Sequence, residues 1–233
     1  MEEATNPSSC MTDAILAELR SKGSDQTRKT LLRHGAPEPL WGVKFGDLRP
    51  MARRIGTDGS LSESLWKTGN ADAMTLALLI ADPGSIRSSS IDRMIRDTDY
   101  GLLLQMIADV TAKSPHRNAK WQRWQKAKSE KLLVCGYTLL ASWLVSDQAS
   151  VPDGVIERAL HNIDHSLHGS PNLARHAMNQ ALIAMGIYCS SYRDTALQIA
   201  DRLGKVVVDH GDTACKTPDA RGYIEKALRR KSK

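Results

Sequence analysis

The stretch Asp99–Trp143 reads DYGLLLQMIADV, then TAKSPHRNAKWQRWQKAKSEK, then LLVCGYTLLASW. Its two outer parts carry apolar residues at helical spacing, whereas the middle part is basic and contains two tryptophans. Between Lys113 and Lys131, seven lysines and arginines are opposed by one acid, Glu130. Two apolar helices around a basic segment indicate an all-helical fold, and the charge favours a polyanionic partner.

The size of the chain fits one large helical domain. It has 233 residues, of which 41% are hydrophobic, and we expect a single domain over residues 11–233 behind a flexible polar tail, residues 1–10. The net charge is +6 and the sequence pI is about 9.2. This excess permits a nucleic acid or an anionic membrane as partner and requires neither.

The cysteines and the N-terminus bear on the compartment. Four cysteines lie far apart, without a CxxC motif, so a disulfide framework or a zinc module is not indicated. The first residues, MEEATNPSS, are acidic and polar, unlike a signal peptide. No apolar run approaches the roughly 20 residues of a membrane helix. We therefore expect a cytoplasmic protein.

Helical periodicity runs through nearly all of the chain from Thr12 onward, and almost no segment alternates as a strand would. Thr12, Ser24 and Thr217 are expected N-caps, with Pro218 as a first helical residue. Helices are expected over residues 13–22, 25–34, 47–55, 61–68, 71–81, 85–96, 100–112, 118–127, 130–145, 155–167, 171–187, 192–203 and 218–230. Helix pairs joined by short Gly, Pro or Ser turns are typical of an α-solenoid, whose concave face binds something extended; an irregular helical bundle is the alternative.

Four stretches resemble one protein family. They are GVKFGDLRPMARRIG (Gly42–Gly56), LWKTGNADAMTLALLIADP (Leu65–Pro83), the DYGLLL region that begins at Asp99, and the tail from NQALIAMGI (from Asn179) through VVVDHGDTACKTPDARGYI (Val206–Ile224). Together they make the chain similar to the AlkD-like DNA alkylation repair family, within the HEAT-like repeat DNA glycosylases.

This resemblance implies a HEAT-like helical solenoid with a concave basic face that binds duplex DNA. In active members it also implies excision of N3- or N7-alkylated purines, the activity of a DNA N-glycosylase. An alkylated purine is cationic and leaves readily. The protein therefore has to hold the DNA backbone, offer an aromatic face and place a carboxylate near the reacting sugar.

The sequence departs from the family's pattern at the catalytic positions. In active members the DYGLLL helix carries a Trp followed four residues later by an Asp, and a later helix carries an Arg. Here Tyr100 stands at the Trp position and Leu104 at the Asp position, while Val134 or Cys135 stands at the Arg position. Leucine can neither orient a water molecule nor stabilise an oxocarbenium ion. Excision by the family's usual residues is therefore not expected.

The expected phosphate contacts are basic residues on helices and next to helix starts. They are Arg49, Arg53, Lys113, Arg117, Lys120, Arg123, Arg175 and Lys216. Tyr100 is the candidate aromatic facing a lesion, with packing between helices as the alternative. Trp121 and Trp124 lie three residues apart and fit either stacking on exposed bases or the helical core.

The segment Asp209–Asp219, DHGDTACKTPD, is the most polar and distinctive in the chain. A metal site at Asp209, His210 and Cys215, a phosphate site at Lys216, and a structural clasp are its three interpretations. The clasp is favoured, since three candidate ligands in an irregular loop are weak evidence for a metal. No motif for a nucleotide or another cofactor is present, so none is expected.

Three hypotheses follow for the function. The first is a DNA-binding member of the alkylation repair family, acting as a monomer and excising alkylpurines if it is active. The second is a non-catalytic binder of branched or distorted DNA, which the loss of the Asp and Arg positions favours. The third is a helical solenoid that binds other proteins.

Overall fold

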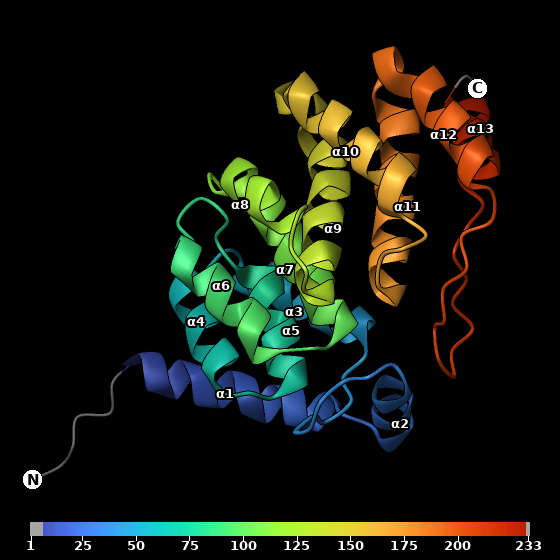
Figure 1. Ribbon diagram of the computed structural model, residues 1–233. Coiled ribbons are helices and arrows are strands. Elements are labelled where there is room, and N and C mark those ends of the chain that lie inside the picture. The colour runs from blue at the N-terminus through green and yellow to red at the C-terminus, as the bar shows by residue number, and fades with distance from the viewer. Residues whose placement is uncertain (1–6, 232–233) are drawn as a thin grey trace, which may run out of the picture. The chain divides into compact units, whose positions relative to one another are not determined.

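The computed structural model describes residues 7–231, and within this range it contains α-helices and two short 3-10 helices but no strand (Figure 1). The α-helices are α1 (Pro7–Lys22), α2 (Asp25–Arg33), α3 (Phe45–Ile55), α4 (Gly59–Lys67), α5 (Ala71–Ile80), α6 (Ser88–Asp97), α7 (Gly101–Ala112), α8 (Arg117–Trp124), α9 (Glu130–Asp147), α10 (Asp153–Ser166), α11 (Asn172–Tyr188), α12 (Arg193–Leu203) and α13 (Ala220–Lys231). The chain forms two compact units, and the boundary along the sequence falls within α7, unit 1 ending at Met106 and unit 2 beginning at Ile107.

Unit 1 is built around α5, which is buried along almost its whole length and packs against α3 and α4. Asn70 caps this helix by accepting hydrogen bonds from the backbone N–H groups of Asp72 and Ala73, both at 3.1 Å. The buried carboxylate of Asp72 in turn accepts from the N–H groups of residues 41–43. This link fixes the turn before α3 onto α5.

Gly42 is the residue that allows this turn. Its φ is +81°, and a Cβ at this position would collide with the backbone of Arg28. A residue with a side chain would therefore meet both a steric clash and an unfavourable backbone conformation. The backbone conformation and the close approach of Arg28 therefore explain why position 42 is a glycine.

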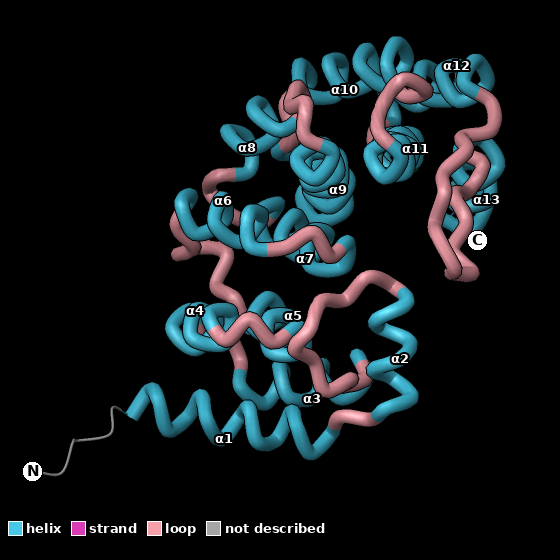
Figure 2. The backbone as a smooth tube through the Cα atoms, turned by 60° about the horizontal axis from the view of Figure 1, so that its bottom comes forward, coloured by secondary structure: helices cyan, strands magenta, loops and turns pink. Residues whose placement is uncertain are grey.

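Unit 2 has α9 and α11 as its central pair, and Figure 2 shows them side by side. Here α8 packs on α9, while α12 and α13 pack on α11. The largest buried side chains include three tryptophans from α8 and α9 together with Tyr137. A Cβ built on Gly186 of α11 would lie 2.5 Å from Cδ1 of Ile224, so the α11–α13 contact depends on this glycine.

Most expected helices are present, with shifted ends. The first helix begins at Pro7, so Thr12 lies inside α1 and is not its N-cap. Residues 1–6 of the expected tail lie outside the described residues. Ser24 does cap α2, accepting from the N–H of Thr27 at 3.4 Å. The last helix begins at Ala220, and the carboxylate of Asp219 caps it by accepting from the N–H of Gly222 at 2.7 Å.

The segment Glu130–Ser150, with 21 residues, is long and apolar enough to cross a membrane by length and composition alone. The expectation that no apolar run approaches this length is therefore wrong. The central helix of a helical protein passes the same test, and α9 occupies that position in unit 2 through its packing against α8 and α11. Within its most apolar window, 39% of the residues are buried.

Candidate nucleic-acid interface

The basic segment of unit 2 consists of Lys113–Lys131, with α8 in its middle. Its basic side chains comprise an exposed set, the partly buried Arg117 and Lys131, and the buried Lys120. The exposed cations are Lys113, Arg123, Lys126 and Lys128. The first two were expected as phosphate contacts, while the other two belong to the same run but were not singled out. Both follow the end of α8, where helical spacing no longer predicts which side chains face outward.

The inward face of α8 carries Lys120, Trp121 and Trp124, all buried. Residues 120 and 124 lie one helical turn apart and residue 121 is next to them, so all three side chains lie on the same face of α8. Lys120 is only 3% exposed, and its Nζ lies 5.8 Å from the centre of the Trp124 ring. The expectation that Lys120 reaches a phosphate is corrected, because its ammonium group lies in the interior of unit 2.

Both tryptophans belong to the core of unit 2. The ring of Trp121 makes an edge-to-face contact with that of Tyr137, with 5.4 Å between centroids. Burial raises the pKa of Tyr137 to about 12. Stacking of Trp121 or Trp124 on DNA bases would require the core to open. The core alternative considered for these residues is the one that the structure supports.

Arg117 is held at the end of α9 and is only partly exposed. Its guanidinium makes an ion pair with Asp147 at 3.2 Å and lies over the Trp143 ring, 4.8 Å from its centroid. A hydrogen bond from Ser150 and the charge of Arg117 lower the pKa of Asp147. A DNA phosphate would therefore have to compete with Asp147 for this arginine.

The polar segment Asp209–Asp219 is hydrogen-bonded along α11, and we call it the clasp. Asn172 donates to the carbonyl of Asp209 at 2.6 Å and accepts from its N–H at 2.8 Å. Asn179 donates to the carbonyl of Pro218 at 2.9 Å. The described residues contain no group of three or more His, Cys, Asp or Glu side chains suited to a metal ion. These contacts agree with the structural interpretation of the segment.

Two histidines meet at the clasp. Nδ1 of His176 and Nε2 of His210 each lie 3.0 Å from the hydroxyl oxygen of Thr217. The hydroxyl has one proton, so it donates to one ring and accepts from the other. This role explains why Thr217 does not cap α13: its side chain is used 41 residues away in sequence, on α11. Lys216 beside it is exposed.

Acidification is expected to loosen the clasp. Burial, followed by the nearby His210, lowers the pKa of His176 below 6.5 in the folded protein. The His176 imidazole therefore binds a proton more tightly in the unfolded chain than in the folded protein. The stabilisation is complete above about pH 6.5 and is lost as the pH falls towards the lower folded pKa. Hydrogen exchange of the amides of residues 209–217, corrected for intrinsic rates, should accelerate at pH 5.5 relative to pH 7.5. A His176→Gln variant should show a flatter response; an equal response would contradict the assignment.

Arg175 of α11 is half-buried. One of its guanidinium nitrogens donates to Oδ1 of Asn172 at 3.2 Å, while its Nε has no hydrogen-bond partner among the described residues. Its side chain therefore braces Asn172, which holds the clasp. As an expected phosphate contact, Arg175 is less accessible than the exposed lysines of the basic segment.

Unit 1 carries its own exposed cations on α3. Arg49 and Arg53 both face solvent, and the guanidinium carbon of Arg49 lies 4.9 Å from the centre of the Phe45 ring. The neighbouring Arg54 is paired instead with Glu18 of α1, with one contact of 3.2 Å. Arg49 and Arg53 therefore have the exposure that a phosphate contact requires.

Of the positions aligned with the family's catalytic residues, Tyr100, Leu104 and Cys135 are buried, whereas Val134, the other candidate for the Arg position, is partly exposed. Tyr100 is 6% exposed and Leu104 is 4% exposed within unit 1, and burial raises the pKa of Tyr100. Cys135 is fully buried in unit 2, where burial raises its pKa to about 12. Packing thus accounts for Tyr100, which corrects its expected role as an aromatic facing a lesion.

The half-buried carboxyl nearest to these positions in the sequence is that of Asp109 on α7. It accepts a hydrogen bond from the hydroxyl of Ser142, and burial raises its pKa. Asp147 and Asp209 are already engaged by Arg117 and by the clasp. Sequence spacing gave no signal for the Asp109–Ser142 pair, because the partners are 33 residues apart.

Paired helices without strands in the described residues, together with exposed cations, define a helical-repeat protein with a basic surface segment. Residues 15–208 match the model of the family described as DNA alkylation repair enzyme. The chain belongs to this family.

Two relatives and one solved structure support the assignment. The uncharacterized proteins Lin0241 of Listeria innocua and Lmo0209 of Listeria monocytogenes are 28% and 29% identical over 225 residues, covering 94% of this chain and 97% of each relative. The solved structure is 27% identical, with a TM-score of 0.86 and 94% of both chains covered. It is described as belonging to a new family of proteins related to the HEAT-like repeat DNA glycosylases with affinity for branched DNA structures. The all-α, HEAT-like repeat fold expected from the sequence is thereby confirmed.

Proposed function

We propose that this protein binds DNA through the phosphate backbone and does not excise alkylated bases with the residues that active relatives use. The exposed cations of the basic segment carry the proposal, since Lys113, Arg123, Lys126 and Lys128 all face solvent. Arg49 and Arg53 supply further exposed cations in unit 1. Contacts of this kind give binding that depends on salt and not on sequence.

A preference for branched DNA is the more specific part of the proposal. Support comes from the solved structure with a TM-score of 0.86, whose protein is described as having affinity for branched DNA structures. The residues at the family's Asp and Arg positions favour binding over excision, because Leu104 and either Val134 or Cys135 supply neither a carboxylate nor a guanidinium. A binder needs an exposed basic surface, whereas a glycosylase also needs an accessible carboxylate.

Two assays on one preparation test this function. In a gel-shift competition, a four-way junction should displace bound protein at a lower concentration than a linear duplex of the same length and base composition. Incubation with methylated duplex DNA should release no free 7-methylguanine or 3-methyladenine above the level without protein.

Equal competition by the junction and the linear duplex would refute the branched preference. Binding that is unchanged between low and moderate salt would refute the backbone contacts. Release of a methylated base would refute a role limited to binding, and loss of that release in Asp109→Asn would identify the carboxyl group responsible.

A further inference from the structure

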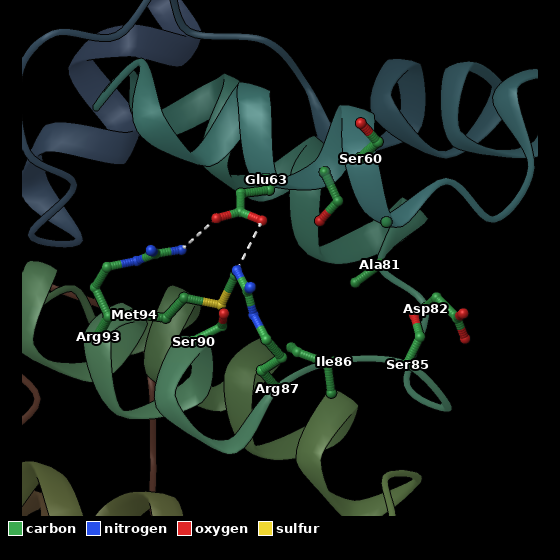
Figure 3. A pocket seen from close by; sticks show the side chains of 12 residues that line it. Ser60, Glu63, Ala81, Asp82, Ser85, Ile86, Arg87, Ser90, Arg93 and Met94 are labelled. Carbon is green, nitrogen blue, oxygen red and sulfur yellow. Dashed lines mark hydrogen bonds and ion pairs between the residues drawn. The ribbon is translucent and has the colours of Figure 1, made fainter.

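A polar pocket of about 510 Å³ lies in unit 1 between α4 and α6 (Figure 3). Two arginines, two acids and several serines line it. Those that matter here are Ser60, Glu63, Asp82, Arg87, Ser90 and Arg93. None of them was singled out by the sequence, because they come from three separate segments: α4, the connection between α5 and α6, and α6 itself.

The two arginines of this pocket have N–H donors that their ion pairs with Glu63 do not use. The carboxylate of Glu63 is shared by Arg93 at 3.1 Å and by Arg87 and Lys67, each at 3.5 Å. The hydrogen bond from Arg93 is the main cause that lowers the pKa of Glu63. Three cations thus surround one carboxylate, and each guanidinium has five N–H donors. Glu63 holds the two arginines at the pocket wall without using all of their donors.

Asp82 is the second acid of the lining and is already satisfied. Its Oδ1 accepts from the N–H of Gly84 at 3.0 Å, and a hydrogen bond from the side chain of Ser85 is the main cause that lowers its pKa. Figure 3 shows Asp82 at the opposite side of the pocket from Glu63 and Arg93. Among the lining residues the two arginines balance the two acids, and Lys67, which pairs with Glu63 from outside the lining, adds one positive charge.

The hydroxyl of Ser90 is the feature of the pocket that indicates a hydrogen-bond acceptor as ligand. It is only 8% exposed and lines the pocket, yet its hydroxyl has no hydrogen-bond partner among the described residues. Figure 3 shows this hydroxyl on the pocket wall between Arg87 and Arg93. The hydroxyl oxygen itself opens onto the pocket space, so it can donate to an acceptor that enters the pocket. Ser90 also lies in the first turn of α6, where the helix dipole favours negative charge.

We infer that this pocket binds a phosphate group through Arg87, Arg93 and Ser90. A tetrahedral anion offers separate oxygens to the three donors, which are directed from different points of the wall. The phosphate group can belong to a free phosphorylated compound or to a DNA backbone. The inference does not rest on the proposed function, because all three residues lie within unit 1 and can be tested without DNA.

The test is a titration of the full chain with inorganic phosphate at constant ionic strength, followed by amide ¹H–¹⁵N correlation spectra. Wild type should show saturable shifts at residues 59–63 and 85–91. Arg93→Gln and Arg87→Gln should each weaken binding about tenfold, and Ser90→Ala about fivefold. The matched controls, Arg96→Gln and Ser89→Ala, lie on the same helix with exposed side chains and should stay within about twofold of wild type.

Shifts that never saturate would overturn the inference, as would equal weakening in the site variants and their controls. Arg87 is largely exposed, so Arg87→Gln retains the fold even if another variant does not. Adding a DNA junction then separates the two sources. If DNA displaces phosphate and Arg87→Gln weakens DNA binding, the group belongs to a DNA backbone. If DNA does not displace phosphate and Arg87→Gln leaves DNA binding unchanged while phosphate still binds, the phosphate group belongs to a free compound.

Discussion

Replacing Asp72 by alanine is expected to lower the free energy of unfolding by about 3 to 5 kcal/mol. Asp72 is 2% exposed, and its Oδ2 accepts from the N–H groups of Trp41 at 2.6 Å and Gly42 at 3.0 Å. Its Oδ1 accepts from the N–H of Val43 at 3.0 Å. Alanine would leave these donors without an acceptor, two of them buried.

The measurement is urea denaturation followed by circular dichroism. Asp72→Asn keeps one acceptor oxygen but turns an N–H donor towards the turn, so it should fall between wild type and Asp72→Ala. Asp13→Ala, at an exposed position on α1, is the matched control and should change stability by less than about 0.5 kcal/mol. A loss below about 1 kcal/mol in Asp72→Ala would show that the turn finds other acceptors or water.

The same aspartate shows what sequence can and cannot predict. The apolar run after Asn70 and the good N-cap indicate a helix over residues 71–81, and α5 is there. Helical periodicity depends on neighbours three or four residues apart, so it locates helices well. The partners of Asp72 are about 30 residues away, and no local pattern reports them.

At the candidate site, too, sequence predicts the local features and misses the contacts between distant segments. Charge counting finds the basic segment, because it depends on residue types alone. It does not say how α8 is rotated, and that rotation buries Lys120 with the two tryptophans while leaving Arg123 outside. The use of Thr217 by His176 and His210, and the pocket between α4 and α6, likewise arise from contacts between segments distant in sequence.

The last prediction concerns the basic segment. Changing Lys113, Lys126 and Lys128 together to glutamine is expected to weaken binding of a DNA junction about 10- to 100-fold at low salt. The three lysines are exposed, so their loss removes charge without opening the core. Each phosphate contact contributes about 0.9 to the slope of log affinity against log salt concentration, so the slope should become shallower by about 2 to 3.

The control must match the change in net charge, because any loss of three cations weakens attraction to DNA over long range. Arg20, Lys29 and Arg33 on α1 and α2 are also exposed, and changing them to glutamine removes the same charge. This variant should lose affinity by less than about fivefold, with little change of slope. Fluorescence anisotropy over a salt series measures both quantities. Equal losses in the two triple variants would mean that net charge, and not the basic segment, attracts the DNA.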